Sequence, residues 1–251
     1  MSDQLQELRD SVRHLGDVAS SIDPPNYTAP AYPKDWTVAE TFSHLGSGAV
    51  IGRRSFEDAL AHRESDPASN TAVWDEWNAK GPTAQVVDCL ASELDYLSSL
   101  EAATEDQRED FHFTMGPFEF DFDGLVGLRL SEHVLHTWDV EVAFAPSATL
   151  SSDAANAILD RIQFIVSRTG KSTGAPREVT IRTTDSGREF TLVLDVDSVD
   201  LVESRHEGAV DLTISAEALV RLIYGRLDQE HTPVSVTGEV VNLLRLVFPG
   251  F

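Results

Sequence analysis

The spacing of apolar and polar residues in the first 148 positions predicts amphipathic helices. In four segments apolar residues recur every three or four positions, which places them along one face of a helix. Pro24-Pro25 ends the first segment, and a polar loop is predicted at residues 65–70. The predicted helices cover residues 5–22, 37–61, 83–102 and 124–143. Four helices of similar length favour a helical bundle.

The second predicted helix carries a start signal. Thr37 is followed three positions later by Glu40, which is the capping-box pattern. In that pattern the hydroxyl and the carboxylate accept hydrogen bonds from N–H groups that have no partner within the helix. The sequence therefore predicts that this helix opens at Thr37, after a Pro-rich stretch through Pro30 and Pro33.

Beyond residue 148 the pattern changes from helical spacing to alternation. Apolar and polar residues alternate on both sides of Asp185-Ser186-Gly187, which predicts a hairpin. The predicted strands cover residues 178–183, 189–194, 199–202, 209–214 and 234–236, and the predicted helices cover residues 153–168, 216–224 and 239–247. This half is predicted to be an α+β domain with an antiparallel sheet and helices packed on one side. The chain is thus predicted to be multi-domain, with an all-α domain at residues 1–148 and an α+β domain at residues 149–251.

Charge narrows the range of partners. The chain has 251 residues, of which 42 are acidic and 19 basic, and its formal net charge is −23. A surface this negative repels phosphate backbones and anionic lipid headgroups, so we expect neither nucleic acid nor a membrane as a partner. The single cysteine, Cys89, fits a reducing compartment, and the polar N-terminus lacks the apolar stretch of a secretory signal. We therefore expect a soluble, cytoplasmic protein that is a monomer or a small homo-oligomer.

The last predicted helix of the first domain carries a stripe of ionisable residues. Its members lie at spacings of three, four and three: Arg129, Glu132, His136 and Asp139. Apolar residues flank the stripe, so it borders the buried side, where charged groups are costly unless they pair or bind a metal. A Glu and a His four positions apart can supply two ligands to one ion. The alternative is a solvated helix face with a weak ion pair.

A zinc site needs a third ligand. His44 on the second predicted helix is the candidate, although a single histidine among apolar neighbours is also typical of a hydrogen-bonded core residue. His133 is another candidate, but a helix turns it about a third of a circle away from Glu132. We interpret His133 as a surface residue.

These residues resemble the mycothiol-dependent maleylpyruvate isomerase family. The resemblance rests on residues 37–45 (TVAETFSHL), the ionisable stripe, residues 218–226 (ALVRLIYGR) and residues 236–239 (VTGE), and it covers nearly the whole chain. It implies a DinB-like four-helix bundle followed by a domain similar to sterol carrier proteins. It also implies that His44, Glu132 and His136 bind zinc or another divalent metal.

The resemblance implies a reaction as well. Two imidazoles and one carboxylate leave a position on zinc that a thiol can take as its thiolate. The chain offers no evident nucleophile, because we interpret Cys89 as a packing residue. The implied cofactor is mycothiol, which would add to the double bond of maleylpyruvate; rotation and expulsion of the thiol would give fumarylpyruvate.

A dianionic substrate needs a cation to hold its carboxylate. Arg226, just after Gly225, matches the family's Gly-Arg element and is the expected clamp, with Arg221 as the second choice. The alternative is an arginine at a helix end that faces the last carbonyl groups of its own helix.

Two further residues are expected to support the site. Asp139 is expected to accept a hydrogen bond from the far nitrogen of His136 and to fix its tautomer. Arg129 is expected to pair with Glu132 or Asp139, or to contact the cofactor.

Three other functions stay open. A mycothiol S-transferase that detoxifies electrophiles would use the same thiolate chemistry. A non-catalytic ligand-binding protein would need a roomy cavity in the second domain, whereas the enzyme needs a polar pocket between the domains. In a protein that keeps the metal for stability alone, metal removal would lower the melting temperature without any catalytic loss.

Overall fold

The computed structural model describes residues 3–64 and 66–250. The chain divides after residue 148 into two compact units. Among the described residues, each helix is too short or too polar to cross a lipid bilayer.

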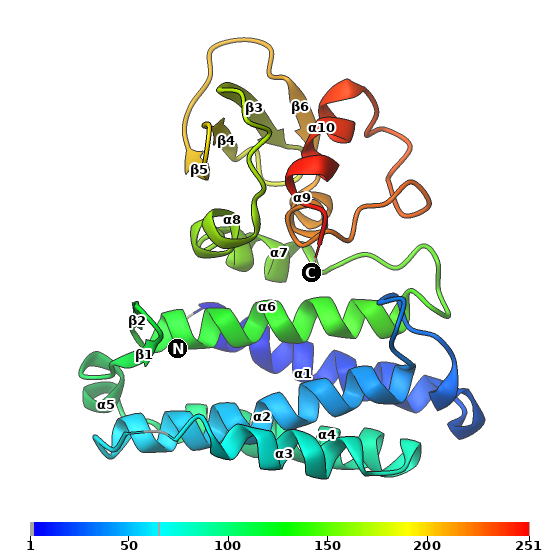
Figure 1. The fold of residues 1–251 in the computed structure, drawn as a ribbon, viewed down its shortest axis with the longest axis vertical. Helices are drawn as coiled ribbons and strands as arrows, with labels where there is room; N and C mark the ends of the chain where they lie inside the picture. The colour runs from blue at the N-terminus through cyan, green and yellow to red at the C-terminus, as the bar shows by residue number, and fades with distance from the viewer. Residues whose placement is uncertain (1–2, 65, 251) are drawn as a thin grey trace. The chain divides into compact units, whose positions relative to one another are not determined.

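The first unit is built mainly from helices (Figure 1). Its elements are, in chain order, α1 (Asp3–Ser21), the 3-10 helix η1 (Pro24–Thr28), α2 (Val38–Leu60), α3 (Ser69–Asn78), α4 (Pro82–Ala102), α5 (Glu105–Glu109), the strands β1 (Phe113–Met115) and β2 (Phe118–Phe120), and α6 (Phe122–Glu141). Helix α1 packs against α6, and α2 packs against α4 and α6. The four long helices therefore run beside one another, and the predicted helical first half is confirmed.

Local signals set where these helices begin. The N–H of Glu40 donates to Thr37 Oγ1 (3.2 Å) and the N–H of Thr37 donates to Glu40 Oε2 (2.7 Å), so the predicted capping box is confirmed. Pro82 stands at the first position of α4, where an N–H would have no partner within the helix. At the start of α6, the Asp121 carboxylate accepts a hydrogen bond from the N–H of Gly124 (2.6 Å).

The core of the first unit joins α1, α2, α4 and α6. One cluster of buried residues in this core is formed by Leu15, Val18, Ala19, Ile22, Tyr27, Val38, Ala39, Phe42, Leu45, Trp77, Val86, Cys89 and Val140. Cys89 is fully buried, which confirms its interpretation as a packing residue. Burial also raises the pKa of its thiol well above the usual value, so it stays protonated and unreactive.

Two segments of the first unit differ from the prediction. Ser69 and Asn70, predicted as loop, begin α3, while residue 65 of that loop lies outside the described residues. The loop predicted around Gly116-Pro117 contains the two strands of the hairpin β1–β2, with Gly116-Pro117 as its turn. In α3 only Trp77 is buried among the described residues, and each of these strands has three residues. Such segments are too short or too polar to show a period.

The second unit contains a four-stranded sheet and helices (Figure 1). Its elements are α7 (Ser152–Leu159), α8 (Gln163–Thr169), β3 (Arg177–Thr183), β4 (Glu189–Leu194), β5 (Val199–Glu203), β6 (Leu212–Ile214), α9 (Ala216–Ile223) and α10 (Glu239–Val247). Buried and partly exposed residues alternate along β4, and the buried Phe190 pairs with Ile181 of β3. One face of the sheet is therefore buried, which confirms the predicted α+β class.

The sheet is mixed, not purely antiparallel as predicted. The strand order is β5-β4-β3-β6, and β6 pairs parallel to β3 with Ile181 opposite Leu212. Strands β3, β4 and β5 form an antiparallel meander, but β6 joins the opposite edge of the sheet. Residues 204–211 therefore cross from one edge to the other instead of forming a hairpin, and strand periodicity alone does not show this.

Two smaller predictions in the second unit are also wrong. The helix predicted at residues 153–168 is broken into α7 and α8, and the Asn156 carbonyl near the break accepts a hydrogen bond from Arg188 Nη1 (3.1 Å). The strand predicted at residues 234–236 is a turn in which Val234 is exposed. The predicted end of α9 is confirmed, because Gly225 takes a left-handed conformation (φ 70°) that ends the helix.

Candidate metal centre

Three side chains from two helices of the first unit converge at one point. His44 Nε2 on α2 lies 3.3 Å from Glu132 Oε2 on α6, and His136 Nε2 lies 3.6 Å from the same oxygen. One ligand atom from each of the three residues lies within 4.8 Å of the others. Within residues 3–64 and 66–250, this is the one group of three or more His, Cys, Asp or Glu side chains close enough to share an ion.

The helices explain this convergence. Glu132 and His136 are four positions apart, so one turn of α6 places both on the same stripe. His44 lies two turns into α2, which packs against α6. The three side chains differ in solvent exposure: those of His44 and Glu132 are 43% and 48% exposed, whereas that of His136 is 12% exposed.

The donor set and its spacing fit a divalent ion. Two ligand atoms at 2.0–2.2 Å from a tetrahedral zinc ion lie roughly 3.4 Å apart. The distances from Glu132 Oε2 to the two imidazole nitrogens, 3.3 and 3.6 Å, lie on either side of that value. Two imidazoles and one carboxylate also match a zinc site that keeps a position open for an exogenous ligand.

Asp139 fixes the ring of His136 from the other side. Its Oδ2 lies 2.8 Å from His136 Nδ1, and the carboxylate is fully buried. A carboxylate accepts here, so Nδ1 carries a proton, and in the neutral ring the lone pair of Nε2 is available to a metal on the side of Glu132. The ring of His136 is therefore oriented for ligation by its own helix.

The electrostatics of the group favour a carboxylate anion. Partial desolvation opposes ionisation of Glu132, whose side chain is still 48% exposed, but hydrogen bonds from His136 and His44 outweigh it and lower the pKa of this carboxyl group. Burial likewise disfavours the imidazolium form of His136, yet Asp139 and Glu132 together raise the pKa of that ring. Without an ion, the negative charge of Glu132 thus lies next to the imidazole of His136, which readily takes a proton. A divalent cation bound at the site would replace that proton.

Trp36 also lies at this centre, although the sequence pattern did not indicate it. Its indole ring lies 5.0 Å from the ring of His44 and 5.7 Å from that of His136, centroid to centroid. The one feature of the sequence that points to Trp36 is its position directly before Thr37, where the helix that carries His44 begins. A periodic pattern does not show where the ring of a loop residue points.

Arg129 has different partners from those predicted. Its guanidinium forms a buried ion pair with Glu93 on α4, and Nη2 donates to the carbonyl oxygen of Leu45 (2.9 Å). It pairs neither with Glu132 nor with Asp139, because its guanidinium is directed to Glu93 of α4 and to the main chain of α2 instead. Its expected contact with a cofactor stays a prediction.

His133 is buried, so its interpretation as a surface residue is wrong. Its side chain is 0% exposed, and Nδ1 lies 2.7 Å from Ser11 Oγ on α1. Burial, with the nearby charge of Arg129, lowers the pKa of His133 well below its usual value, so the ring is neutral. Helix α1 covers this side of α6, and the separation of His133 from the three converging residues follows from that packing.

The predicted substrate clamp belongs to the second unit. Arg226 is 8% exposed, follows the end of α9 and donates from Nη1 to the carbonyl oxygen of Tyr224 (3.1 Å). Arg221, the second choice, is buried and forms an ion pair with Glu217 (2.8 Å). Arg226 therefore makes a helix-end contact of the kind named as the alternative, and its role toward a substrate stays a prediction.

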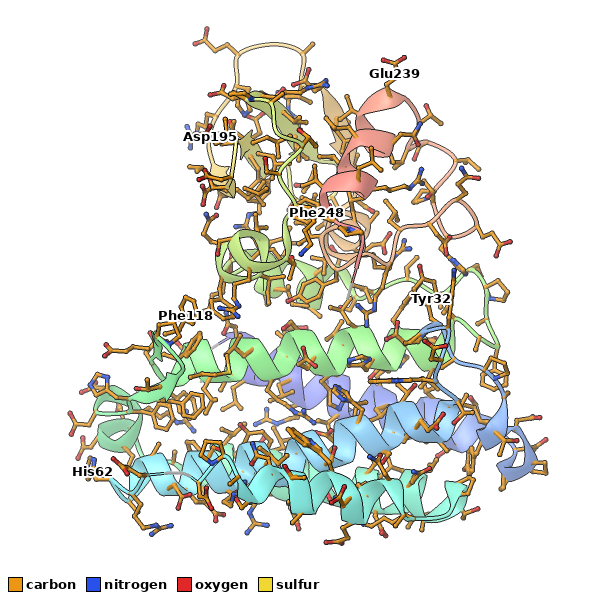
Figure 2. The ribbon with its side chains drawn as sticks, viewed as in Figure 1. Tyr32, His62, Phe118, Asp195, Glu239 and Phe248 are labelled. Atoms are coloured by element: carbon orange, nitrogen blue, oxygen red, sulfur yellow. The ribbon has the colours of Figure 1, made fainter. Side chains whose placement is uncertain are left out.

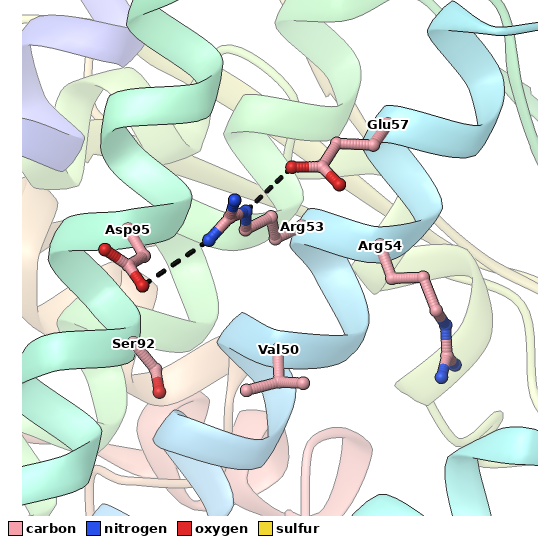
Figure 3. A pocket seen from close by; sticks show the side chains of 6 residues that line it. All are labelled: Val50, Arg53, Arg54, Glu57, Ser92 and Asp95. Atoms are coloured by element: carbon pink, nitrogen blue, oxygen red, sulfur yellow. Dashed lines mark hydrogen bonds and ion pairs between the residues drawn. The ribbon is translucent and has the colours of Figure 1, made fainter.

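A groove of about 150 Å³ lies elsewhere on the first unit (Figure 3). It is lined by Val50, Arg53, Arg54, Glu57, Ser92 and Asp95. Arg53 points toward two carboxylates, Glu57 (2.7 Å) and Asp95 (3.4 Å), so its charge is already balanced within the groove. None of the three converging residues lines this groove, and it is separate from the candidate metal centre.

The chain is similar to known proteins in sequence and in fold. Residues 8–141 match the family model described as mycothiol maleylpyruvate isomerase N-terminal domain. Two solved structures are similar in fold: the mycothiol-dependent maleylpyruvate isomerase and a histidine-to-alanine mutant of it. Each is 15% identical in sequence, covers 90% of both chains and has a TM-score of 0.65. No curated protein matches the chain significantly in sequence.

Proposed function

The chain belongs to the mycothiol maleylpyruvate isomerase family through its N-terminal domain, and on this premise we propose that it is a thiol-dependent metalloenzyme. In this proposal His44, Glu132 and His136 hold a divalent metal, zinc in the first instance. The reaction is the cis–trans isomerisation of maleylpyruvate to fumarylpyruvate with mycothiol as the thiol. The observation that carries the proposal is the convergence of three ligand atoms within 4.8 Å.

The chemistry divides between the metal and the chain. When bound, the metal would keep a thiol in its thiolate form at neutral pH, and a thiolate is the form that adds to an electrophilic double bond. Glu132 supplies the negative charge that balances the cation. Asp139 holds the proton of His136 on Nδ1, so that Nε2 stays available as a ligand.

The chain itself offers no competing thiol. Its one cysteine, Cys89, is buried in the core, and its raised pKa keeps it protonated. An external thiol is therefore required for any thiolate reaction at this site. The partially exposed His44 and Glu132 leave the centre accessible to such a molecule.

Arg226 is the residue that we propose to bind a substrate carboxylate. The chain has a net charge of −23, which repels a dianion unless a local cation compensates. A guanidinium can form two parallel hydrogen bonds with a carboxylate. Arg226 would in this way hold the substrate while the thiol reacts with its double bond.

The metal content of purified protein tests the site. We expect about one zinc ion per chain, and we expect His44→Ala or His136→Ala to abolish it. His112→Ala is the matched control, because His112 is an exposed histidine outside the group. Full zinc occupancy in both ligand variants would mean that the ligands are wrong.

Turnover of a substrate panel tests the reaction. Metal-loaded protein is incubated with mycothiol and either maleylpyruvate or simple electrophiles such as alkyl halides. Formation of fumarylpyruvate supports the isomerase, whereas formation of thioether conjugates alone would support a mycothiol S-transferase instead. Absence of any turnover by protein that carries its metal would contradict the enzyme proposal.

A further inference from the structure

A short segment of the first unit closes over one side of the candidate metal centre. Residues 29–37, here called the Trp36 strap, connect η1 to α2. The strap is folded back on itself: the N–H of Ala31 donates to the carbonyl oxygen of Trp36 (2.9 Å), and the N–H of Val38 donates to that of Ala29 (2.9 Å). The position of Trp36 is therefore set by main-chain hydrogen bonds.

The Trp36 strap is also fastened to α6. The N–H of Tyr32, a residue labelled in Figure 2, donates to the carbonyl oxygen of Asp139 (3.0 Å). The centroid of the Tyr32 ring lies 4.9 Å from that of Trp138. Asp139 is the same residue whose carboxylate orients His136. Asp139 thus contacts both the strap, through its carbonyl oxygen, and the candidate ligand His136, through its carboxylate.

The indole of Trp36 contacts both imidazoles of the centre. It stacks on the ring of His136 with an angle of 25° between the planes, and it lies against His44 at 44°. The two imidazoles lie 4.6 Å from each other, so the three rings form one cluster. Each ring limits the rotation of the other two.

The two histidines differ in how the rest of the chain holds them. His136 Nδ1 has the buried carboxylate of Asp139 as its partner. His44 has Glu132 at Nε2, but within residues 3–64 and 66–250 no hydrogen-bond partner is found for its Nδ1. A metal-binding histidine is ordinarily oriented through that second nitrogen. In His44, which is 43% exposed, contact with Trp36 takes the place of such a bond.

We propose that Trp36 is a positioning residue that fixes the imidazole plane of His44, and secondarily that of His136, for binding a divalent metal. This inference rests on the proposed function, because it assumes that the three residues bind a metal. The mechanism is steric: the strap holds the indole, and the indole excludes ring orientations of His44 that turn Nε2 away from Glu132.

The test compares metal binding by the full chain and three variants. Trp36→Leu keeps an apolar side chain without a ring, Trp36→Phe keeps an aromatic face, and Trp74→Leu removes an exposed tryptophan of α3 as the matched control. Zinc affinity is measured by competition with a chelator. The visible absorption of the cobalt-substituted proteins reports the ligand geometry, and thermal melting of the metal-free proteins reports stability.

We expect Trp36→Leu to weaken zinc binding roughly 10- to 100-fold, the usual effect of losing a residue that orients a metal ligand. The cobalt absorption bands should shift and weaken in this variant. Trp36→Phe should restore most of the affinity and spectrum, and Trp74→Leu should match the unmodified protein. A purely structural role of Trp36 would lower the melting temperature of the metal-free protein without changing the cobalt spectrum.

The possible failures are distinguishable. If the unmodified protein binds neither zinc nor cobalt, the proposed function is wrong, and this inference falls with it. If the unmodified protein binds both metals but Trp36→Leu binds them with the same affinity and spectrum, the inference alone is wrong. If Trp36→Phe behaves like Trp36→Leu, an aromatic face is not sufficient and the steric mechanism is overturned.

Discussion

Arg129 on α6 donates a hydrogen bond of 2.9 Å to the carbonyl oxygen of Leu45 on α2. Leu45 directly follows His44, and Arg129 precedes Glu132 by one turn. The hydrogen bond therefore joins the two helices beside the point where their candidate ligands meet. The same guanidinium forms the buried ion pair with Glu93, so one side chain links α2, α4 and α6.

Replacing Arg129 should weaken both the fold and the candidate centre. Arg129→Met leaves the Glu93 carboxylate buried without its cation, and we expect the free energy of unfolding to fall by about 3–5 kcal/mol. Zinc affinity should fall as well, because the tie to Leu45 is lost. Urea unfolding and chelator competition measure the two effects.

Arg53→Ala is the control for removing an arginine. Arg53 is 43% exposed and its ion pairs are at the surface, so its loss should change the free energy of unfolding by less than about 1 kcal/mol. The double variant Arg129→Met/Glu93→Leu should recover much of the lost stability, since no charge is then left buried. An Arg129→Met variant as stable as the Arg53→Ala control would contradict this account.

The buried carboxyl of Glu93 should make stability depend on pH. Burial outweighs the attraction of Arg129 and raises the pKa of Glu93 from 4.5 to about 7. The folded state then binds the proton more tightly than the unfolded state. The contribution of Glu93 to the free energy of unfolding therefore falls as the pH rises from about 4.5 to about 7, and it is constant at higher pH. The difference between the two pKa values corresponds to a total loss of about 3 kcal/mol in the free energy of unfolding across this pH range.

Glu93→Gln isolates that contribution. The variant does not titrate at this position, so the free energy of unfolding of the unmodified protein, relative to that of Glu93→Gln, should decline across this pH range. Denaturant unfolding at closely spaced pH values gives both curves. Parallel curves for the two proteins would show that Glu93 ionises normally in the folded state.

Features set by local rules were predictable from the sequence. The capping box at Thr37 and Glu40 predicts where α2 begins, because it needs residues only three positions apart. The spacing of Glu132 and His136 likewise places both on one stripe of α6. His44 was a candidate third ligand from its own segment, but only the resemblance to a known family assigned it to the same metal, because no local rule connects it to α6.

Features set by packing between distant segments were not predictable. The partner of Arg129 is Glu93, and nothing in the local pattern shows that a residue of α4 reaches Arg129 on α6. His133 is buried for the same reason, because Ser11 of α1 lies against it. Strand β6 pairs parallel to β3 although each strand has an ordinary pattern. Periodicity shows which face of an element is buried, but the element that buries it depends on the whole fold.

Asp139→Asn should impair metal binding without unfolding the protein. An amide can present its NH₂ group to His136 Nδ1, which would move the ring proton to Nε2, the nitrogen that faces Glu132. We expect zinc affinity to fall roughly 10- to 100-fold. Asp17→Asn, at an exposed position of α1, is the control and should bind zinc normally. Equal zinc affinity in the two variants would refute the role of Asp139.

Arg226→Gln should lower turnover while the metal stays bound. Arg226 is not among the ligand candidates, so the zinc content should equal that of the unmodified protein. If its guanidinium holds the substrate carboxylate, the KM for maleylpyruvate should rise, whereas a neutral electrophile should be affected less. Arg168→Gln, an exposed arginine of α8, is the control. Unchanged kinetics with maleylpyruvate would rule out the clamp.

Two glycines in helices should respond in opposite ways to alanine. A Cβ atom at Gly46, on the α2 turn that carries His44, would lie 2.2 Å from the Trp77 ring and 3.0 Å from the Cys89 Cα. Trp77 is buried and cannot move away freely, so Gly46→Ala should lower the free energy of unfolding by about 1–3 kcal/mol. A Cβ atom at Gly16 on α1 meets nothing within 4 Å, so Gly16→Ala should raise it by about 0.5–1 kcal/mol, because alanine favours the helix. Urea unfolding followed by circular dichroism measures both. Stabilisation by Gly46→Ala would show that α2 does not pack against α3 and α4 as closely as this fold requires.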